Sequence, residues 1–477
     1  MSTKIRKFFE DICKIPRCSG DEQGMSRYLL SFAEERGLEA FKEEASGNII
    51  IRKPASPGYE ASPAVILQGH MDMVCEKHSE AEHDFATDPI RTFEKDGWLC
   101  AEGTTLGADN GVAVAYALAI LDAEDLFHPP LEVLITTDEE TSMKGAELLE
   151  PRHLSGKTLF NLDAGEEGVF YVSSAGGRDY NHILSFAKEP PSLGRSLEIH
   201  ISGLKGGHSG ADIDKERGSS AKILGRILYE LRGVCSFELA KIQAGAKKNA
   251  IAREASAKIQ IAPKDLDAVR ETIQKMQEIL NFELKGSDEL QITISESDSP
   301  SHVMDKASAD KLIDLIMLIP HGVLKMSQEI EGLVVCSQNL GVIETLENTA
   351  VLSTSIRSSV ASLKEEAVQK MEILTKLFAI DGYSDSDYPE WAYQSNSKIR
   401  PLAQSLYSEI YGKEPCIRAI HAGLECGFFA DLLKENEIDI LSFGPTMLDI
   451  HSPDERLDLA SFERVYDFLV RLLAKMK

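Results

Sequence analysis

Histidines and carboxylates recur in this sequence at places where an apolar run has just ended. They are His70, Asp72, Glu139, Glu140, Asp163 and His451, and Asp109 stands in a further polar motif, L-G-A-D-N-G, ahead of a long apolar segment. Such a set offers nitrogen and oxygen donors without a thiolate, which suits two divalent ions. The residue types therefore predict a metal centre, with zinc as the first choice and cobalt or manganese as alternatives.

The motif H-M-D (70–72) could supply both a ligand and its support. Side chains two residues apart on an extended segment point to the same side. A carboxylate in that position can accept the second N–H of a metal-binding imidazole and fix its tautomer. We expect Asp72 to orient His70 in this way, although a polar loop with one histidine and one aspartate would show the same letters.

The other motifs also have plain structural interpretations. Asp109 could cap a helix, because aspartate is favoured at that position. The stretch N-L-D-A-G-E-E (161–167) could be a turn after a strand, and H-S-P-D-E-R (451–456) could lead into a helix. The acids of D-E-E (138–140) would repel one another at a strand end unless a cation neutralised them. We expect Asp138 to be a structural carboxylate that binds nearby backbone.

These motifs need elements that bring distant segments to one edge. The predicted strands are the apolar runs at 48–52, 64–68, 131–137, 158–163 and 438–445, and helical patterns cover 5–15, 23–36, 112–121, 402–411 and 461–476. Strands that alternate with helices favour a mostly parallel sheet flanked by helices, which is an α/β fold. The carboxyl ends of parallel strands lie on one edge, where sites assemble.

The pattern changes after a linker-like stretch, A-K-E-P-P-S-L-G-R-S (187–196). Residues 196–281 and 291–379 each show the order strand, helix, strand, strand, helix. We therefore predict an inserted α+β domain of two similar halves. The predicted domains are one built from both termini, 1–186 and 385–477, and the inserted domain, 187–384.

The composition limits the classes of function. The chain of 477 residues has a net charge of −26 and 43% hydrophobic residues. Packed cores are therefore expected, whereas nucleic acid and anionic membranes are disfavoured as partners, because both are polyanions. Eight scattered cysteines without a C-x-x-C pair favour reduced thiols. We expect a cytoplasmic protein, because no leader-like start and no run of 18 uncharged apolar residues occurs.

The motifs also come in a recognisable order. H-M-D, G-A-D-N-G, D-E-E, L-D-A-G-E-E, G-G-H-S-G and H-S-P-D-E follow one another in the order typical of M20 metallopeptidases. K-G-G-H-S-G (205–210), K-N-A-I-A-R-E-A (248–255) and I-H-A-G-L-E-C-G (420–427) resemble the aminoacyl-histidine dipeptidase branch in particular. The resemblance covers the whole chain, and it implies a zinc-peptidase-like catalytic domain with a lid.

The resemblance implies three groups of site residues. The metal ligands would be His70 and Asp163 on one ion, Glu140 and His451 on the other, and Asp109 between them. The catalytic residues would be Asp72, which orients His70, Glu139 as general base, and His208 of the lid as oxyanion donor. The substrate contacts would be Asn249, Arg357 and Gly423. Two further histidines, His200 and His421, are not expected among the ligands.

The activity that the resemblance implies is a dinuclear metallo-dipeptidase that cleaves unblocked dipeptides, including Xaa-His dipeptides. An aminotripeptidase or an N-acyl amino-acid hydrolase of the same superfamily is the alternative. A metal-dependent scaffold is disfavoured, because Glu139 is present although it need not bind metal. The partner would be a small peptide substrate. A homodimer is compatible with the resemblance, and His208 would then act either in its own chain or in the partner.

Overall fold

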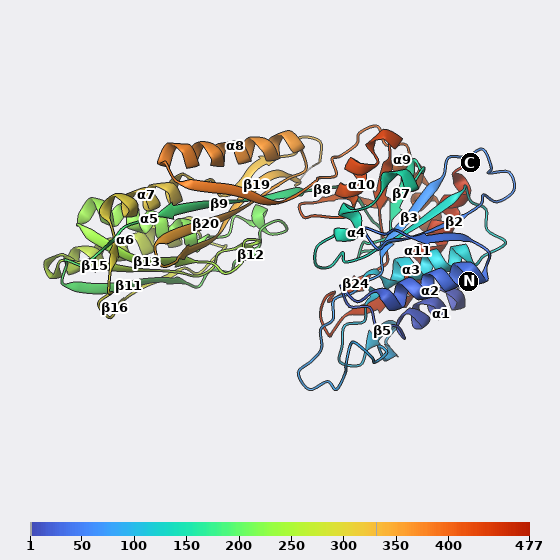
Figure 1. Ribbon diagram of the computed structural model, residues 1–477, viewed down its shortest axis with the longest axis horizontal. Helices are drawn as coiled ribbons and strands as arrows, with labels where there is room; N and C mark the ends of the chain where they lie inside the picture. Colours follow the sequence, from blue (N-terminus) through green and yellow to red (C-terminus); the bar gives the residue numbers. More distant parts are fainter. Residues whose placement is uncertain (1, 331) are drawn as a thin grey trace. The chain divides into compact units, whose positions relative to one another are not determined.

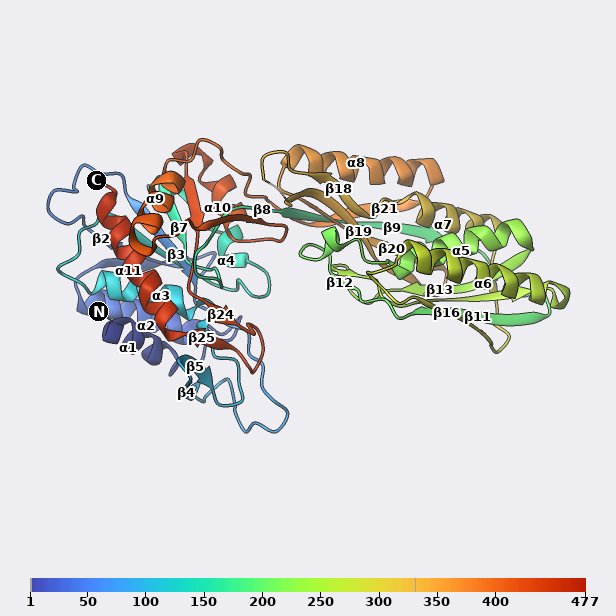
Figure 2. The same cartoon turned by 180° about the vertical axis from the view of Figure 1, so that it is seen from behind.

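The computed structural model describes residues 2–330 and 332–477, which divide into two compact units (Figures 1 and 2). The first unit is Met1–Ser173, Trp391–Ala419 and Leu424–Lys477, and the second is Ser174–Glu390 and Ile420–Gly423. The insert is thus longer than predicted at both ends, because β9 (Gly176–Ser185) and β21 (Asp381–Tyr388) pair within the sheet of the second unit. The four residues from Ile420 to Gly423 were predicted in the catalytic domain and belong instead to the second unit.

The first unit is built on an eight-stranded sheet in the order β1-β2-β6-β3-β7-β23-β8-β22. Its strands are β1 (Glu39–Lys42), β2 (Ile49–Lys53), β3 (Val65–His70), β6 (Leu131–Thr136), β7 (Thr158–Asn161), β8 (Val169–Ser174), β22 (Cys416–Ile420) and β23 (Asp439–Ser442). The four central strands β6, β3, β7 and β23 run parallel, and antiparallel strands flank them. The predicted α/β class is confirmed, and the five predicted strands are present.

Helices cover both faces of this sheet. The helices of the first unit are α1 (Ser2–Ile12), α2 (Gln23–Glu35), α3 (Ala108–Leu121), α4 (Lys144–Glu147), α9 (Ile399–Tyr411), α10 (Cys426–Leu432) and α11 (Leu459–Lys475). α1, α2, α3 and α11 gather on one side (Figures 1 and 2). On the other side Ile66 and Leu134 pack with Phe429 of α10. Because both faces are covered, every residue of β3 is buried, which explains its continuous apolar sequence.

A four-stranded antiparallel sheet, β24-β25-β5-β4, completes the first unit. It consists of β4 (Thr92–Lys95), β5 (Trp98–Ala101), β24 (Met447–Leu448) and β25 (Arg456–Asp458). The connection from β24 to β25 contains His451. This small sheet therefore fixes both ends of the loop that carries a predicted ligand.

The second unit carries a nine-stranded sheet, of which eight strands follow the order β16-β11-β15-β13-β19-β20-β9-β21, while β18 pairs with β19. The strands are β11 (Arg195–Ser202), β13 (Phe237–Ala244), β15 (Ala255–Ile261), β16 (Gln291–Glu296), β18 (Gly322–Met326), β19 (Val334–Thr345) and β20 (Thr349–Ser358), with β9 and β21. Its helices are α5 (Ser220–Val234), α6 (Leu266–Glu283), α7 (Lys306–Leu318) and α8 (Ala361–Phe378).

The predicted order of strand, helix, strand, strand, helix is present twice in this unit, as β11-α5-β13-β15-α6 and β16-α7-β19-β20-α8. The strand pairing does not follow the two halves. β11 pairs with β15 of its own half, whereas β16 pairs with β11, and β9 takes the corresponding place beside β20. The first strand of the second half has therefore been exchanged for a strand that precedes both halves.

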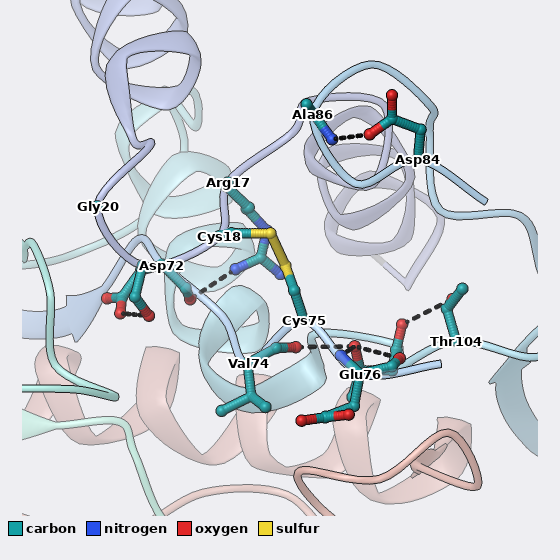
Figure 3. Close-up of a disulfide and its surroundings, with 12 residues drawn as sticks. Arg17, Cys18, Gly20, Asp72, Val74, Cys75, Glu76, Asp84, Ala86 and Thr104 are labelled. Carbon is teal, nitrogen blue, oxygen red and sulfur yellow. Dashed lines mark hydrogen bonds between the residues drawn. A yellow bond between two sulfur atoms is a disulfide. The ribbon is translucent and has the colours of Figure 1, made fainter. Parts of the chain in front are cut away.

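The cysteines differ from the expectation of free thiols in one pair. Cys18, between α1 and α2, forms a disulfide with Cys75, which follows β3 (Figure 3). The other six cysteines are free. Because 57 positions separate the two partners, their proximity is a property of the fold and not of any local motif. Among the described residues, no helix has the length and apolar character that crossing a membrane requires.

Candidate active site

His70 stands at the carboxyl end of β3 with its two ring nitrogens in different surroundings. Nδ1 lies 3.3 Å from Oδ1 of Asp72 and 3.2 Å from the Asp72 carbonyl oxygen. Both neighbours of Nδ1 are acceptors, so Nδ1 carries a proton, and Nε2 is the nitrogen that could bind a metal ion. Nε2 faces the carboxylates of Asp109, at 3.1 Å, and Asp163, at 3.7 Å. The predicted orienting role of Asp72 agrees with this geometry.

Asp109 places its two carboxylate oxygens against histidines from distant segments. Oδ1 faces Nε2 of His70, and Oδ2 lies 3.3 Å from Nε2 of His451. The same nitrogen of His451 lies 2.9 Å from Oε2 of Glu140. Asp109 has φ −80° and ψ 108° near the start of α3. Both of its carboxylate oxygens face histidines, which does not support the alternative interpretation of Asp109 as a helix cap.

Glu455 caps α3 in place of Asp109. Its buried carboxylate accepts the backbone N–H groups of four consecutive residues, 106–109, at 2.8, 2.9, 2.8 and 3.2 Å. A carboxylate at a helix N-terminus satisfies unpaired amides and complements the helix dipole. Since Glu455 follows His451 by four residues, it ties the loop of one histidine to the turn of Asp109. The motif H-S-P-D-E contained this residue, but only its histidine was assigned.

The contacts of Gly107 and Asn110 explain why the G-A-D-N-G turn has these residues. Gly107 has φ +68°, and a Cβ there would lie 2.4 Å from a guanidinium nitrogen of the buried Arg17. Asn110 accepts the N–H of His70 through Oδ1, at 3.2 Å, and donates to the carbonyl of Leu162, at 2.9 Å. Asn110 thus links the ends of β3 and β7, from which His70 and Asp163 project.

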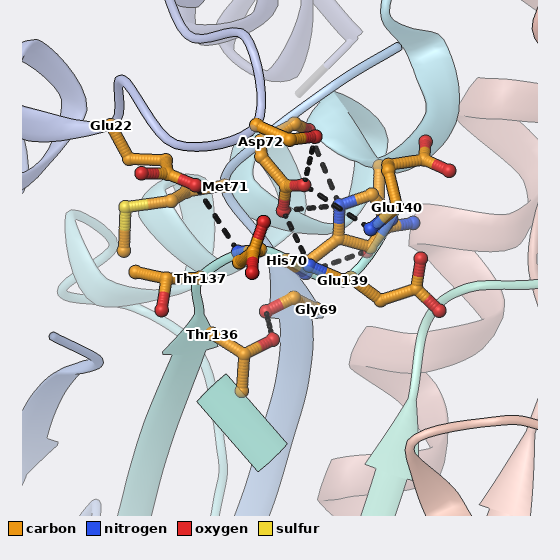
Figure 4. Close-up of polar contacts among 12 residues, drawn as sticks. Glu22, Gly69, His70, Met71, Asp72, Thr136, Thr137, Glu139 and Glu140 are labelled. Carbon is orange, nitrogen blue, oxygen red and sulfur yellow. Dashed lines mark hydrogen bonds and ion pairs between the residues drawn. The ribbon is translucent and has the colours of Figure 1, made fainter. Parts of the chain in front are cut away.

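The segment after β6 presents Glu139 and Glu140 through their backbone. Asp72 accepts the N–H of Glu139 with Oδ1, at 3.1 Å, and the N–H of Glu140 with Oδ2, at 3.2 Å (Figure 4). Asp138 has a left-handed φ of 54°, and its carboxylate accepts from the hydroxyls of Thr141 and Ser142. We expected backbone donors for Asp138, so its structural role holds but the donors are side chains.

The charges of the cluster act on one another. Burial raises the pKa of Glu139 to about 8, and burial with the neighbouring charge of Asp109 raises the pKa of Asp163 well above its usual value. Hydrogen bonds to Asp109 and Glu140 raise the pKa of His451 to about 10. The buried carboxylates thus outnumber the histidines beside them, and two of the carboxylates, Glu139 and Asp163, hold their protons more tightly than usual.

The donor set fits divalent metal ions. Atoms of His70, Asp109 and Glu140 lie within 4.8 Å of one another and can hold an ion. Oε1 of Glu140 is buried and has no hydrogen-bond partner among the described residues, so one oxygen is available as a ligand. Two imidazoles and three carboxylates without a thiolate suit zinc, cobalt or manganese. The positive charge of such ions would stabilise the ionised acids.

A layer of polar side chains precedes the predicted ligands by two residues on the same strands. Gln68 precedes His70 by two residues, and Asn161 precedes Asp163 by two. Oε1 of Gln68 accepts from Asn161 at 2.6 Å, and its Nε2 donates to Glu425 at 2.6 Å. The hydroxyl of Thr136 donates to the same Glu425 oxygen at 3.0 Å. Sequence reasoning missed this layer, because Glu425 comes from the start of α10.

His208 of the second unit has a defined tautomer. Its Nδ1 accepts the backbone N–H groups of Gly210, at 3.2 Å, and Ala211, at 3.0 Å. Burial and the nearby charge of Arg357 lower the pKa of His208 below its usual value. The neutral imidazole therefore carries its proton on Nε2, which can donate a hydrogen bond.

Arg357 is also placed precisely within the second unit. Only 8% of this residue is exposed, so Arg357 is not a solvated strand residue. Its Nη1 donates to the hydroxyl of Tyr388 at 2.9 Å, and its Nε donates to the hydroxyl of Ser209, the neighbour of His208, at 3.4 Å. Neither hydroxyl was singled out in the sequence, because Ser209 and Tyr388 lie 148 and 31 residues from Arg357 along the chain.

The remaining candidates also lie in the second unit. Asn249 is exposed, and its carbonyl accepts the N–H of Ser209 at 2.9 Å. Gly423 is partly exposed in the connection from β22 to α10. His421 is buried against the hydroxyl of Ser337, at 2.7 Å. His421 and the exposed His200 therefore stay outside the metal set, as expected.

The likeness to known proteins extends over the whole chain. The model of peptidase family M20/M25/M40 matches residues 66–475. A cytosol non-specific dipeptidase of Escherichia coli K12 is 36% identical over 470 residues, which cover 98% of this chain and 96% of that protein.

Solved structures give the same result. The crystal structure of an aminoacylhistidine dipeptidase from Vibrio alginolyticus matches with a TM-score of 0.94 and 36% identity, over 99% of this chain and 96% of the other. An aminopeptidase PepT from Bacillus cereus matches with a TM-score of 0.58 and 14% identity, over 100% and 99%, and shares the fold. On the extent of these matches, the family predicted from the motifs is confirmed, and the chain belongs to peptidase family M20/M25/M40.

Proposed function

We propose that this protein is a dinuclear metal-dependent dipeptidase that hydrolyses unblocked dipeptides, Xaa-His dipeptides among them. The observation that carries the proposal is the placement of Asp109, whose two oxygens face His70 and His451. A carboxylate placed in this way suits a bridge between two ions. The substrate class is supported by the whole-chain likeness to two dipeptidases.

The metal ligands are proposed in two sets. His70 and Asp163 would hold one ion, Glu140 and His451 the other, and Asp109 both. Zinc is the proposed metal, with cobalt or manganese as alternatives. When bound, two such ions polarise a peptide carbonyl and lower the pKa of water.

Glu139 is the proposed general base. Its neighbour Glu140 is turned to His451, while Glu139 makes no side-chain hydrogen bond within the described residues, so its carboxylate is free to move a proton. Burial raises the pKa of Glu139 to about 8, and bound ions would lower this pKa again, toward the range in which a group both accepts and releases a proton near neutral pH. Glu139 would take the proton of the attacking water and deliver it to the leaving amine.

His208 is the proposed donor to the oxyanion. The two amides on Nδ1 leave Nε2–H available, and a donor that is oriented beforehand favours the transition state over the ground state. Arg357, Asn249 and Gly423 are proposed to bind the backbone and the terminal carboxylate of the peptide. The support for Arg357 is that the guanidinium is buried and held by hydrogen bonds from Nε and Nη1. Its Nη2 has no hydrogen-bond partner in the described part of the second unit and is available to a substrate.

The alternative activities are an aminotripeptidase or an N-acyl amino-acid hydrolase. A panel of four substrates separates them, with protein reconstituted with zinc: a Xaa-His dipeptide, a neutral dipeptide, a tripeptide and an N-acetyl amino acid. We expect the highest kcat/KM with the two dipeptides. Faster cleavage of the tripeptide or the acetylated substrate would rule out the proposed substrate class.

We further propose a cytoplasmic location and a homodimer. The location is supported by the similarity to the bacterial relative, which is named a cytosol non-specific dipeptidase. The dimer rests on the prevalence of symmetric homo-oligomers among enzymes. Sedimentation equilibrium tests the dimer, and a mixture of inactive Glu139 and His208 variants tests whether His208 acts in its own chain, since activity would return only if the histidine acted on the partner.

A further inference from the structure

The disulfide between Cys18 and Cys75 lies beside the carboxylate that supports His70 (Figure 3). Cys18 precedes Ser19, whose hydroxyl donates to Oδ2 of Asp72 at 2.7 Å. Cys75 follows Asp72 by three residues in the same segment. The bond therefore joins the two segments that meet at Asp72.

Non-covalent contacts hold the same two segments in parallel. The guanidinium of Arg17 donates to the carbonyls of Met71 and Asp72, at 3.1 and 2.9 Å. The N–H of Met73 donates to the carbonyl of Arg17 at 3.1 Å. None of these contacts involves the disulfide, so we expect them to preserve the fold when the bond is opened. The expected change is a gain of backbone freedom at Cys18 and Ser19.

We propose that the Cys18–Cys75 pair is a redox-modification site that positions Asp72, through Ser19, for its support of His70. The inference rests on the proposed metal centre, because it assigns to the oxidised pair a tighter hold on the ion bound by His70. Asp72 receives four hydrogen bonds or close contacts, from Ser19, His70 and the N–H groups of Glu139 and Glu140. Ser19 is the one of these donors whose place the disulfide controls directly.

The pair is open to reaction. Both cysteines are partly exposed, whereas Cys13, Cys336 and Cys426 are buried. The reductant is a dithiol: one thiolate attacks a sulfur of the pair, the S–S bond breaks, and the second thiol closes the reductant to its own disulfide. Two electrons and two protons pass to the protein, which then carries two thiols. Disulfides in a reducing compartment are mostly transient or redox-sensing, which agrees with a reversible role.

The first measurement establishes the state of the pair. The protein is denatured without reductant, and its free thiols are alkylated and counted by mass spectrometry. Six modified cysteines are expected before treatment with dithiothreitol and eight after it, since the chain has eight cysteines and six are free. Eight modified cysteines in protein prepared under air would overturn the proposal.

The second measurement is the affinity for Zn²⁺ alone. Oxidised and reduced protein, the latter freed of dithiothreitol without air, compete with a chromophoric chelator. We expect the reduced form and the Cys18→Ser/Cys75→Ser variant to bind the ion assigned to His70 about 3- to 10-fold less tightly, below the 10- to 100-fold effect of direct ligand supports. Saturating Zn²⁺ should restore kcat, which a general loss of fold would not allow.

The route through Ser19 has its own variant. Ser19→Ala retains the disulfide but removes the hydroxyl, so it should weaken Zn²⁺ binding to a similar extent. Reduction of this variant should add little, because the contact that it would loosen is already absent. Cys416→Ser, which removes an exposed free thiol, is the matched control and should respond to reduction like the wild type.

The outcomes separate the inference from the function on which it rests. Failure of every form to bind two Zn²⁺ would reject the metal centre itself. Equal Zn²⁺ affinity in the oxidised and reduced wild type would reject the redox site while the metal centre stands. Fully additive effects of reduction and Ser19→Ala would likewise contradict the proposed route.

Discussion

The Oδ1 atom of Asp72 accepts the backbone N–H of Glu139 at 3.1 Å. The acid that orients the imidazole of His70 thus also fixes the main chain of the proposed base. Burial opposes ionisation of Asp72, but hydrogen bonds from His70, Ser19 and Glu139 lower its pKa to about 2. One ionised side chain therefore contacts both His70 and a segment that begins 67 residues after Asp72 in the sequence.

Replacement of Asp72 by asparagine should disturb both parts at once. The amide would place an NH₂ group against one of the N–H donors and would lose the charge that faces His70. We expect kcat to fall about 10- to 100-fold with weaker Zn²⁺ binding, measured by steady-state kinetics and chelator competition. The control is Asp96→Asn, at an exposed turn residue with a left-handed φ. An Asp72→Asn enzyme with the same kcat and Zn²⁺ affinity as this control would contradict the assigned role.

Glu139→Gln should separate proton transfer from metal binding. The substitution preserves size but removes the base, so kcat should fall about 10²- to 10⁴-fold. The metal content, measured by atomic emission, should stay at two ions per chain. A parallel Glu147→Gln change on the exposed face of α4 should leave both quantities unchanged. Loss of metal in the Glu139 variant would instead make this residue a ligand.

Glu455→Gln should loosen the turn that carries Asp109. The amide nitrogen cannot accept the N–H groups that one carboxylate oxygen now receives. Leaving buried donors unpaired costs about 1–3 kcal/mol each, so we expect a lower thermal midpoint together with weaker Zn²⁺ binding. Excess Zn²⁺ should recover part of the stability, since a ligand of the native state favours that state. A variant with normal Zn²⁺ affinity would limit Glu455 to a role in folding.

Tyr388→Phe should affect binding more than turnover. The change removes only the hydroxyl that accepts from Arg357, and loss of one such hydrogen bond is worth about 1 kcal/mol. We expect KM for a dipeptide to rise about 3- to 10-fold with kcat little changed. A dipeptide amide, which lacks the carboxylate, should show no such rise. An equal effect on both substrates would argue against carboxylate binding by Arg357.

His182 should make the stability of the second unit depend on pH. Burial lowers its pKa to about 4, and its Nε2–H donates to the carbonyl of Met371. The unfolded chain binds the proton at about pH 6.5, and the folded chain only near 4. Stability is therefore unaffected above pH 6.5 and falls as the pH drops toward 4, by about 2 kcal/mol at pH 5.

Urea unfolding at pH 7 and pH 5 measures this effect. His182→Gln keeps a donor to the Met371 carbonyl but cannot be protonated, so its loss of stability between the two pH values should be smaller by that amount. His321 and His421 are also buried histidines with lowered pKa values and contribute equally to both proteins. An identical pH dependence of variant and wild type would contradict the assignment.

The core of the first unit was predictable because its signals are local. Continuous apolar runs such as those of β3 and β6 indicate strands that are buried on both faces, and polar residues at their ends indicate the edge of the sheet where a site assembles. The five strands and the predicted ligands follow from these features. Asp109 needed the structure, because a helix cap and a bridging carboxylate have the same local sequence.

The parts that escaped prediction depend on partners that the chain order does not reveal. Glu455 binds a row of backbone amides almost 350 residues earlier in the chain. Cys18 and Cys75 are separated by one helix, α2, and three strands, β1, β2 and β3. Tyr388 gains its role only through the edge position of β21. The boundaries of the insert were misplaced for the same reason, since β9 and β21 belong to the insert through the pairing of β9 with both β20 and β21.

That pairing has a consequence for how such a chain could have arisen. β9 opens the insert and β21 closes it, and Gly177 and Tyr388 are direct partners in their ladder. The insert between them is therefore a module whose two ends lie side by side. Gaining or lengthening such a module would not force apart the two residues of the first unit to which it is joined. The entropic cost of closing the chain at that point would then change little. Within this module β20 pairs with β9 and not with β16, which pairs with β11 instead, while the first and last strands of the module lie side by side.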